Sequence, residues 1–551
     1  MKAEAGRDGN AQGVQNRVIE LQFQSEKSYA DPFHDVQLAM KVSGEGQERL
    51  YPGFWDGGNV WKIRFSSAEA GRYRYETVCS DEENSVLHHR TGEIEIAPYE
   101  GDNPLYRHGA IRKSADSRYM EHADGTPFFW LADTWWMGLT KRLSWPDHFM
   151  ELAADRVDKG FSVIQIVAGL YPDMEPFDER GANEAGFPWD KDYTSINPSY
   201  FHKMDEKMFA LADCGLLPCL VGCWGFHLGI AGEEVIKRHW RYLLARYGAL
   251  PIVWCVAGEA IMPFYNNPAV GKPDEMARFE AAARSSWTEI ARMIAREDPY
   301  GRLLTIHPTK YGHEMVDDSA LLDLNMLQTG HSSFTSIPDT VRMIRETVAR
   351  EPRLPVINSE VCYEGIGGSS YHDVQRFLFW SCVLSGACGH SYGANGIWQI
   401  NGLDEPYGKS PYGKSWGDTS WREASQLLGS LHVGLGKKLL ERLEWWRFEP
   451  HPEWLGNHAD EERIIAPYAA GIPGESRVIF LPFLEGLLWG GVIIHHMEPD
   501  ITYTAYYYDP ITGRRYDLGQ AAANEEGKWR SGSTPAFQDW VLVLERTASG
   551  S

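Results

Sequence analysis

The chain has 551 residues, of which 43% are hydrophobic and 23% are charged; this balance is typical of a globular protein and excludes a disordered or collagen-like chain. The 53 Lys and Arg against 76 Asp and Glu give a formal charge of −23, which argues against nucleic acid or an anionic membrane surface as the partner. The chain also contains 21 tryptophans. Their flat rings suit the faces of sugars, but such rings also build cores, so composition alone assigns no function.

The first hundred residues predict a disordered N-terminus over 1–15 and a small β-sandwich over 16–100. Segments such as VIELQFQSE, VQLAMKVSG and YRYETVCS alternate apolar and polar residues with period two, and Gly, Pro, Asp and Asn separate them. The run FWDGGNVWKIRFSSAEAGRYRYE resembles the immunoglobulin-like module that precedes many glycosidase catalytic domains. The N-terminus has no apolar signal-peptide core, and the eight cysteines form no CxxC pair, so we expect a cytoplasmic protein.

From 101 to 438 the pattern changes to apolar runs of strand length that alternate with helical segments, which is the signature of an α/β domain. Eight strands with their helices in this length predict a (β/α)8 TIM barrel. A doubly wound sheet is the alternative, but no Gly-rich phosphate loop follows the first strand. The eight runs span residues 128–136, 162–170, 216–224, 251–259, 303–309, 321–331, 355–365 and 388–398.

Residues 439–551 return to strand patterns, among them RVIFLPFL, TYTAYYYDP and DWVLVLER. They predict a second β-sandwich without an obvious polar cluster, which favours a packing role over an independent binding role. The overall prediction is therefore an α/β barrel flanked by an N-terminal and a C-terminal β-sandwich.

Polar and aromatic residues gather where the apolar runs of the predicted barrel end. Because the catalytic residues of TIM barrels sit at the carboxyl ends of the strands, these residues are the candidates for the site. They are Asp133, Trp135, Trp136, Trp224, Glu259, His307, Gln328, His331, Glu360, Tyr363, His390, Tyr392 and Trp398.

Glu259 and Glu360 are carboxylates that directly follow buried strands, IVWCVAG and PVINS. Burial can raise the pKa of one glutamate enough for it to act as an acid while a second stays ionised. Glycoside hydrolysis requires such a pair. Each glutamate alone could equally be a structural ion pair, but the two together, beside strand-end tryptophans, favour the catalytic interpretation.

Three segments, DGTPFFWLADTWWMGLTKRL, IVWCVAGEA and PVINSEVCYEG, resemble the apiosidase-like family of glycoside hydrolases. The resemblance implies a TIM barrel with β-sandwich appendages, in which Glu259 is the general acid/base and Glu360 is the nucleophile. It also implies that Asp133 binds sugar hydroxyls and that Trp135 and Trp136 wall the pocket.

The sequence departs from that family's pattern at the acid/base. Gly258 stands where the related clan usually has asparagine, and close relatives often carry aspartate at the position of Glu259. Glu364 lies four residues beyond Glu360 and competes for the nucleophile role. Glu360 is preferred because it abuts the apolar run, whereas Glu364 lies in a Gly-rich loop.

The remaining strand-end residues are predicted to contact the substrate, with His307, His331 and His390 bonding either to sugar hydroxyls or to the nucleophile. Two long loops are predicted to flank the pocket. The loop 171–193 offers Phe187 and Trp189, and the aromatic-rich segment 398–421 would form the opposite wall. Asp133 and the histidines could instead form a metal site. In metal-dependent barrel hydrolases, however, the first strand normally carries an HxH motif, and the first strand here reads LAD.

The predicted function is thus a retaining, exo-acting glycoside hydrolase that removes a terminal, furanosidic or other, sugar from plant or microbial oligosaccharides. The alternatives are a metal-dependent barrel hydrolase and a non-catalytic carbohydrate-binding protein. No cofactor, metal, nucleic acid or membrane partner is expected. The sequence leaves open the sugar, the linkage and whether the chain forms a homo-oligomer.

Overall fold

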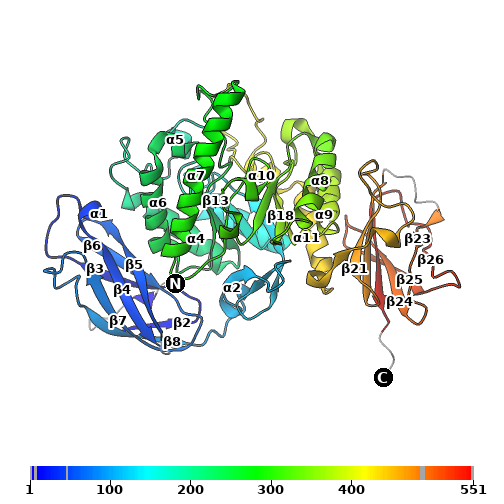
Figure 1. Ribbon diagram of the computed structural model, residues 1–551, viewed down its shortest axis with the longest axis horizontal. Helices are drawn as coiled ribbons and strands as arrows, with labels where there is room; N and C mark the ends of the chain where they lie inside the picture. Colours follow the sequence, from blue (N-terminus) through cyan, green and yellow to red (C-terminus); the bar gives the residue numbers. More distant parts are fainter. Residues whose placement is uncertain (1–2, 5–8, 45–46, 484–489, 548–551) are drawn as a thin grey trace.

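The computed structural model describes residues 3–4, 9–44, 47–483 and 490–547. Two β-rich regions lie at the ends of the molecule and a central barrel with its helices lies between them, as Figure 1 shows.

The N-terminal region is a β-sandwich whose two faces share one long strand. Strand β5 pairs with β4 through its first half and with β6 through its second half, so it passes from one face to the other. Side chains such as Leu21, Met40, Ile63 and Ile94 are buried between the faces. The strands are β1 (Ala3–Glu4), β2 (Ala11–Val14), β3 (Ile19–Gln24), β4 (Leu38–Gly44), β5 (Gln47–Gly57), β6 (Val60–Phe65), β7 (Gly71–Cys79) and β8 (Thr91–Ala97), with the short helix α1 (Pro32–Asp35).

The expectation of a disordered segment over 1–15 is wrong for the part of it that the structure describes. Ala11–Val14 pairs with β8 in parallel, and Ala3–Glu4 pairs with β3. Ala11 is buried in the core of the sandwich, so this segment gains packing that its polar neighbours do not suggest. Residues 1–2 and 5–8 lie outside the described residues.

A three-stranded sheet leads into the barrel, whose eight strands are all parallel. The prediction of a TIM barrel is confirmed: each strand falls within one of the eight predicted runs. The leading sheet consists of β9 (Ile111–Lys113), β10 (Met120–His122) and β11 (Pro127–Phe128), after helix α2 (Pro104–Arg107). The barrel strands are β12 (Trp130–Thr134), β13 (Val163–Val167), β14 (Leu217–Val221), β15 (Val253–Cys255), β16 (Leu304–Thr305), β17 (Asn325–Gln328), β18 (Val356–Glu360) and β19 (Gly389–Tyr392).

The barrel closes between β16 and β17 without a regular ladder. Here Thr305 Oγ1 donates to the carbonyl of Leu324 over 2.8 Å, and the amide of Asp323 donates to the carbonyl of Leu304 over 2.8 Å. Between these two strands the chain forms only two single-turn 3-10 helices, Gly312–Glu314 and Ser319–Leu321, in place of an α-helix.

Amphipathic helices surround the barrel and bury their apolar faces against it. No helix in the described part of the chain is long and apolar enough to cross a membrane. The helices are α3 (Asp147–Lys159), α4 (Pro198–Asp213), α5 (His227–Ala231), α6 (Glu233–Tyr247), α7 (Pro273–Glu297), α8 (Ile337–Val348), α9 (His372–Val383), α10 (Trp421–Ser425) and α11 (Leu428–Leu440).

A buried ionic cluster joins the N-terminal sandwich to the barrel. Arg64 of β6 and Arg246 of α6 both donate to the carboxylate of Asp205 on α4, and Arg64 also donates to Glu20 over 2.8 Å. Both arginines are fully buried. Because a buried charge is tolerated only when it is paired, this cluster fixes the sandwich against one side of the barrel.

The C-terminal region is a six-stranded antiparallel sheet, except that β23 and β26 form a separate pair. Strand β22 is buried on both faces: Val478 and Phe480 face the barrel helices, whereas Ile479 and Leu481 face the region's own core. Arg376 of α9 anchors the contact by donating to Asp539 over 2.8 Å. The strands are β20 (Glu449–Pro450), β21 (Tyr468–Ile472), β22 (Ser476–Leu481), β23 (Ile493–Ile494), β24 (Thr502–Tyr508), β25 (Arg515–Ala522), β26 (Trp529–Arg530) and β27 (Trp540–Arg546).

Candidate active site

A cavity of about 320 Å³ opens at the carboxyl ends of the barrel strands, and both candidate glutamates line it. Glu360 is the last residue of β18, and Glu259 follows the end of β15 by four residues. Aromatic side chains form most of the remaining wall. They are Trp136, Trp224, Tyr265, Tyr363, Trp398, Tyr412 and Trp416.

Glu360 lies deep in the site, 5% exposed, between two histidines. His307 Nε2 lies 2.8 Å from its Oε2, and His331 Nε2 lies 2.9 Å from its Oε1. Burial would raise the pKa of this carboxyl, but the two imidazoles outweigh burial and lower the pKa to about 2. Glu360 is therefore an ionised carboxylate at any neutral or mildly acidic pH, which is the state a nucleophile needs.

The strand that carries Glu360 also orients His307. The hydroxyl of Ser359 donates to the carbonyl of Leu327 over 2.9 Å, and the same oxygen lies 3.1 Å from His307 Nδ1. Both ring nitrogens of His307 thus face oxygen atoms, one of Ser359 and one of Glu360. This fixes the imidazole plane and, through it, one carboxylate oxygen.

Glu259 has the opposite electrostatic character. Burial raises the pKa of this carboxyl and the negative charge of Glu360 raises it further, while hydrogen bonds from Gln328 and Trp224 act in the other direction. Gln328 Nε2 donates to Oε1 and Trp224 Nε1 donates to Oε2, each over 3.0 Å. The two glutamates therefore have pKa values shifted apart, which is the pattern of an acid beside an ionised partner.

The backbone at Glu259 is unusual, since its φ of 43° lies in the left-handed region that non-glycine residues rarely adopt. The structure also explains why residue 258, just before it, is glycine and not the asparagine usual in the related clan. A Cβ on Gly258 would lie 2.2 Å from the ring of Trp224, so the absence of a side chain lets the indole pack over the strand. That packing places Trp224 Nε1 against the carboxylate of Glu259.

The aromatic wall links loops that are distant in the sequence. Trp136 Nε1 donates to the hydroxyl of Tyr363 over 2.8 Å, and the rings of Tyr363 and Trp398 are nearly parallel at 6.4 Å between centroids. Trp398 in turn meets Trp416 edge to face. The predicted residues Trp136, Trp224, His331, Tyr363 and Trp398 thus come together around the two glutamates, and the segment 398–421 supplies one wall.

Four predicted substrate contacts are wrong, because their side chains point away from the cavity. Successive strand residues face opposite sides of a barrel, and Trp130 and Ser391 mark its interior by bonding to each other. Asp133 and Trp135 are fully buried among the helices: Asp133 accepts from Arg156 over 2.6 Å and from the indole of Trp135 over 2.8 Å.

The other two misplaced residues are His390 and Tyr392 of β19. His390 is fully buried against Phe379 of α9, and Tyr392 donates to Glu364 Oε2 over 2.5 Å. Glu364 is 1% exposed and also accepts from the amide of Gly429. This carboxylate therefore lies behind the wall of the cavity, and the preference for Glu360 as the nucleophile is consistent with the geometry.

His307 and Gln328 contact the glutamates, not the open space of the cavity. His307 is fully buried beside Glu360, and Gln328 is 8% exposed beside Glu259. The structure therefore makes them positioning groups for the two carboxylates. The contact of His307 with Glu360 is one of the two roles predicted for this histidine, whereas Gln328 is predicted to contact the substrate and instead bonds to Glu259.

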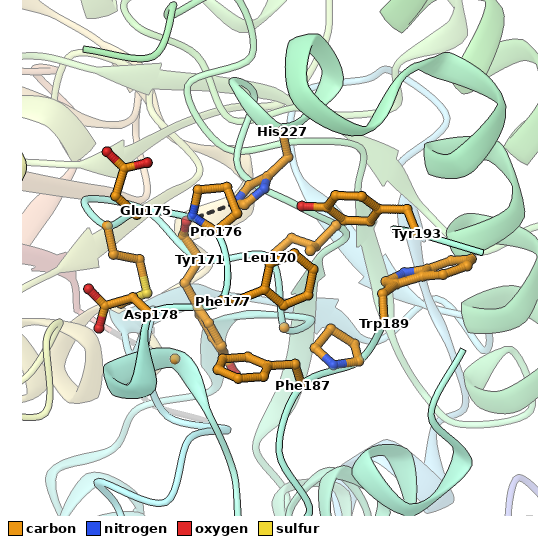
Figure 2. A pocket seen from close by; sticks show the side chains of 14 residues that line it. Leu170, Tyr171, Glu175, Pro176, Phe177, Asp178, Phe187, Trp189, Tyr193 and His227 are labelled. Carbon is orange, nitrogen blue, oxygen red and sulfur yellow. Dashed lines mark hydrogen bonds between the residues drawn. The ribbon is translucent and has the colours of Figure 1, made fainter. Parts of the chain in front are cut away.

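The loop 171–193 lines the catalytic cavity through Pro172 and Asp173. The prediction that Phe187 and Trp189 of this loop contact the sugar does not agree with the structure. These two residues line a separate pocket with Leu170, Tyr193 and His227, as Figure 2 shows. The pocket has a volume of about 20 Å³, which is room for a water molecule and not for a sugar. Trp189 is buried and donates to His239 over 3.2 Å.

Sequence reasoning missed Asp173, Met262, Tyr265 and Lys414, which also line the catalytic cavity. All four lie in the loops after the strand ends and not at the ends themselves. Tyr265 comes six residues after Glu259, so reading the aromatic residues of each βα-loop would have found it.

The metal-site alternative finds no ligand set among the residues that the structure describes, where no group of three His, Cys, Asp or Glu side chains is arranged to hold an ion. Asp133, on which that alternative rested, is paired with a buried arginine.

Comparison with known families gives two matches. Residues 114–447, well over half of the chain, match the model described as apiosidase-like, catalytic domain. Residues 15–80 match a domain of unknown function, DUF5060. No curated protein matches the chain.

Among solved structures, a putative glycoside hydrolase from Bacteroides vulgatus is similar with a TM-score of 0.70 and 17% identity, covering 97% of this chain and all of the other. A family 5 glycoside hydrolase from the same organism has a TM-score of 0.65 and 22% identity, covering 82% of this chain and 95% of the other. At these identities the likeness concerns the fold.

Proposed function

Since the chain belongs to the apiosidase-like family and is a glycoside hydrolase, we propose that it is a retaining, exo-acting enzyme that removes a terminal furanosidic sugar from oligosaccharides. The opposed pKa shifts of Glu259 and Glu360 in one cavity carry the two-carboxylate part of this proposal, whereas retention rests on family membership. They supply the protonated acid and the ionised carboxylate that glycoside hydrolysis needs.

In the proposed mechanism, the Glu360 carboxylate attacks the anomeric carbon while Glu259 donates its proton to the oxygen of the leaving group. The glycosidic bond breaks and a covalent glycosyl-enzyme forms. Glu259, now ionised, then takes a proton from a water molecule that attacks the anomeric carbon. Glu360 leaves as a carboxylate, and both glutamates return to their initial protonation states.

Exo action is supported by the shape of the site. The cavity volume of about 320 Å³ is at the small end of the ~300–1,000 Å³ typical of small-molecule sites, and Glu360, which lines it, is only 5% exposed. The indole nitrogen of Trp398, buried and without a partner among the described residues, is available to donate to a sugar hydroxyl. The proposal of a furanosidic sugar rests on family membership alone.

The test is a screen of nitrophenyl glycosides that includes furanosides, with the anomer of the first product followed by NMR. We expect hydrolysis with retention. Glu360→Gln should be inactive on every substrate, while Glu364→Gln, its matched control four residues away, should keep activity. Activity in Glu360→Gln would overturn the assignment of the nucleophile, and release of the inverted anomer would overturn retention.

Glu259→Gln separates the two roles. General acid catalysis contributes about 10²–10⁴-fold, and this contribution is needed least for nitrophenol, which leaves without a proton. We therefore expect a loss of that size on a disaccharide and a smaller loss on the nitrophenyl glycoside. Equal losses on both substrates would contradict the role of Glu259 as the acid.

A further inference from the structure

Tyr412 stands at the rim of the catalytic cavity with 63% of its surface exposed. A single exposed aromatic residue is common on protein surfaces. This one, however, is packed: its ring centroid lies 4.2 Å from that of Tyr265, which also lines the cavity. The two rings meet edge to face, so Tyr412 keeps most of its surface open to solvent while it is packed against a residue of the cavity.

A single buried carboxylate holds the residues beneath this rim. Asp173, 7% exposed, accepts a hydrogen bond from the hydroxyl of Tyr265 on one oxygen and from Trp416 Nε1 over 3.0 Å on the other. Its backbone carbonyl accepts from the hydroxyl of Tyr407 over 3.1 Å. Asp173 lies in the loop after β13, and its partners lie in the loops after β15 and β19. Asp173 therefore ties three loops into one preformed wall.

The position of this wall relative to the glutamates indicates which part of a substrate it meets. Glu360 is buried, with 5% of its surface exposed, whereas Glu259 is partly exposed. Tyr265 follows Glu259 in the same loop. Burial and the hydrogen bond to Asp173 raise the pKa of the Tyr265 hydroxyl most, and the negative charge of Glu259 adds to them. Because the acid protonates the leaving oxygen, the leaving group lies on the side of Glu259 and extends over Tyr265 toward Tyr412.

Resting on the proposed function, we propose that Tyr412 and Trp416 form the subsite for the leaving group, that this group is a sugar ring with an apolar face, and that Asp173 is the positioning residue of the subsite. A small alcohol would leave the face of Tyr412 uncovered. A sugar ring stacked there is held while Glu259 transfers its proton, so the subsite selects saccharide over alkyl glycosides.

The experiment compares two substrates that share the sugar identified by the nitrophenyl screen: its methyl glycoside and its glycoside to glucose. Stacking on one aromatic ring accounts for about a tenfold effect. We expect Tyr412→Ala to lower kcat/KM about tenfold on the substrate whose leaving group is glucose. On the methyl glycoside we expect a change of less than about twofold, the range of an ordinary surface substitution. Tyr516→Ala, at an exposed tyrosine of β25, is the matched control and should change neither.

Asp173 is tested by the ratio of kcat/KM on the glucose-linked substrate to kcat/KM on the methyl glycoside. Asp173→Ala should lower the ratio as Tyr412→Ala does, while Asp173→Asn keeps a hydrogen-bonding atom for both Trp416 and Tyr265 and should restore most of it. If Asp173 had a merely structural role, Asp173→Ala would lower kcat/KM on both substrates by the same factor and leave the ratio unchanged. Thermal unfolding of each variant confirms that the ratio is measured on folded protein.

The outcomes separate the two proposals. If Tyr412→Ala lowers kcat/KM equally on both substrates, or on neither, the subsite is refuted while the proposed glycosidase activity is unaffected. If Asp173→Ala leaves the ratio unchanged, its positioning role is refuted. If the wild-type chain hydrolyses no glycoside in the screen, the proposed function is refuted, and the subsite with it.

Discussion

Gln328 Nε2 donates a hydrogen bond to Oε1 of Glu259 over 3.0 Å, from a strand two places removed around the barrel. The amide of Gln328 stabilises the ionised form of the carboxyl and so opposes burial, which raises its pKa. This hydrogen bond therefore limits how far the pKa of Glu259 is raised.

Gln328→Met should move the alkaline limb of the kcat/KM profile to higher pH. Removing the donor leaves the ionised Glu259 less stabilised, so its pKa rises further and the protonated, active form persists to higher pH. The measurement is a pH series on a disaccharide substrate, whose leaving group needs the proton from Glu259. A shift to lower pH would contradict the role of Gln328, and Gln165→Met, at a buried glutamine that does not contact Glu259, is the control for loss of an amide.

His331→Gln should act on the opposite limb. Burial favours the neutral form of Glu360, and the two histidines lower its pKa to about 2. With one imidazole removed, the pKa rises, so the nucleophile becomes protonated and activity is lost at a higher pH as the solution is acidified. The acid limb of kcat/KM reports this. An unchanged acid limb would show that His331 contributes nothing to the ionisation of Glu360.

Gly258→Ala should impair catalysis with little change in the fold. The new Cβ would lie 2.2 Å from the ring of Trp224, so the indole must move and its hydrogen bond to Glu259 is lost. A displacement of about 1 Å at a catalytic group can lower kcat about 10²-fold. Activity and far-UV circular dichroism are measured together. Gly229→Ala, where a Cβ meets no atom within 4 Å, is the control, and wild-type kcat in Gly258→Ala would contradict the packing argument.

Asp133→Ala should destabilise the protein without a specific effect on the reaction. Arg156, fully buried, would lose one carboxylate partner, and breaking a buried ion pair from one side costs about 3–5 kcal/mol. Denaturant unfolding should show this loss, while kcat per folded molecule stays near the wild-type value. A selective loss of activity at unchanged stability would restore the original interpretation of Asp133 as a sugar ligand.

The barrel could be predicted from the sequence because its strands are short apolar runs with long helices between them, and every predicted run contains one strand. The glutamates could be predicted because each directly follows such a run. The errors at Asp133, Trp135, His390 and Tyr392 have one physical cause. A residue at a strand end faces the cavity or the helices according to its register, and in runs that are apolar on both faces the sequence does not mark which.

The loops were harder to predict for a different reason. Asp173 acts through partners 92 and 243 positions away in the chain, so no local pattern reveals its role. Composition predicts Trp189 and Phe187 as sugar contacts, yet Trp189 is buried against His239 of α6 and the half-buried Phe187 packs against Phe177 of the same loop. Aromatic side chains thus line the cavity in one loop and only pack against their neighbours in another.

The left-handed backbone at Glu259 sets stability against activity at one position. A non-glycine residue with positive φ costs on the order of 1–3 kcal/mol, and the buried carboxyl adds a penalty of its own. Asparagine adopts this conformation more readily and carries no charge. A search for heat-resistant variants that selects on folding alone will therefore tend to discard this glutamate, and the most stable descendants of the chain are expected to be inert.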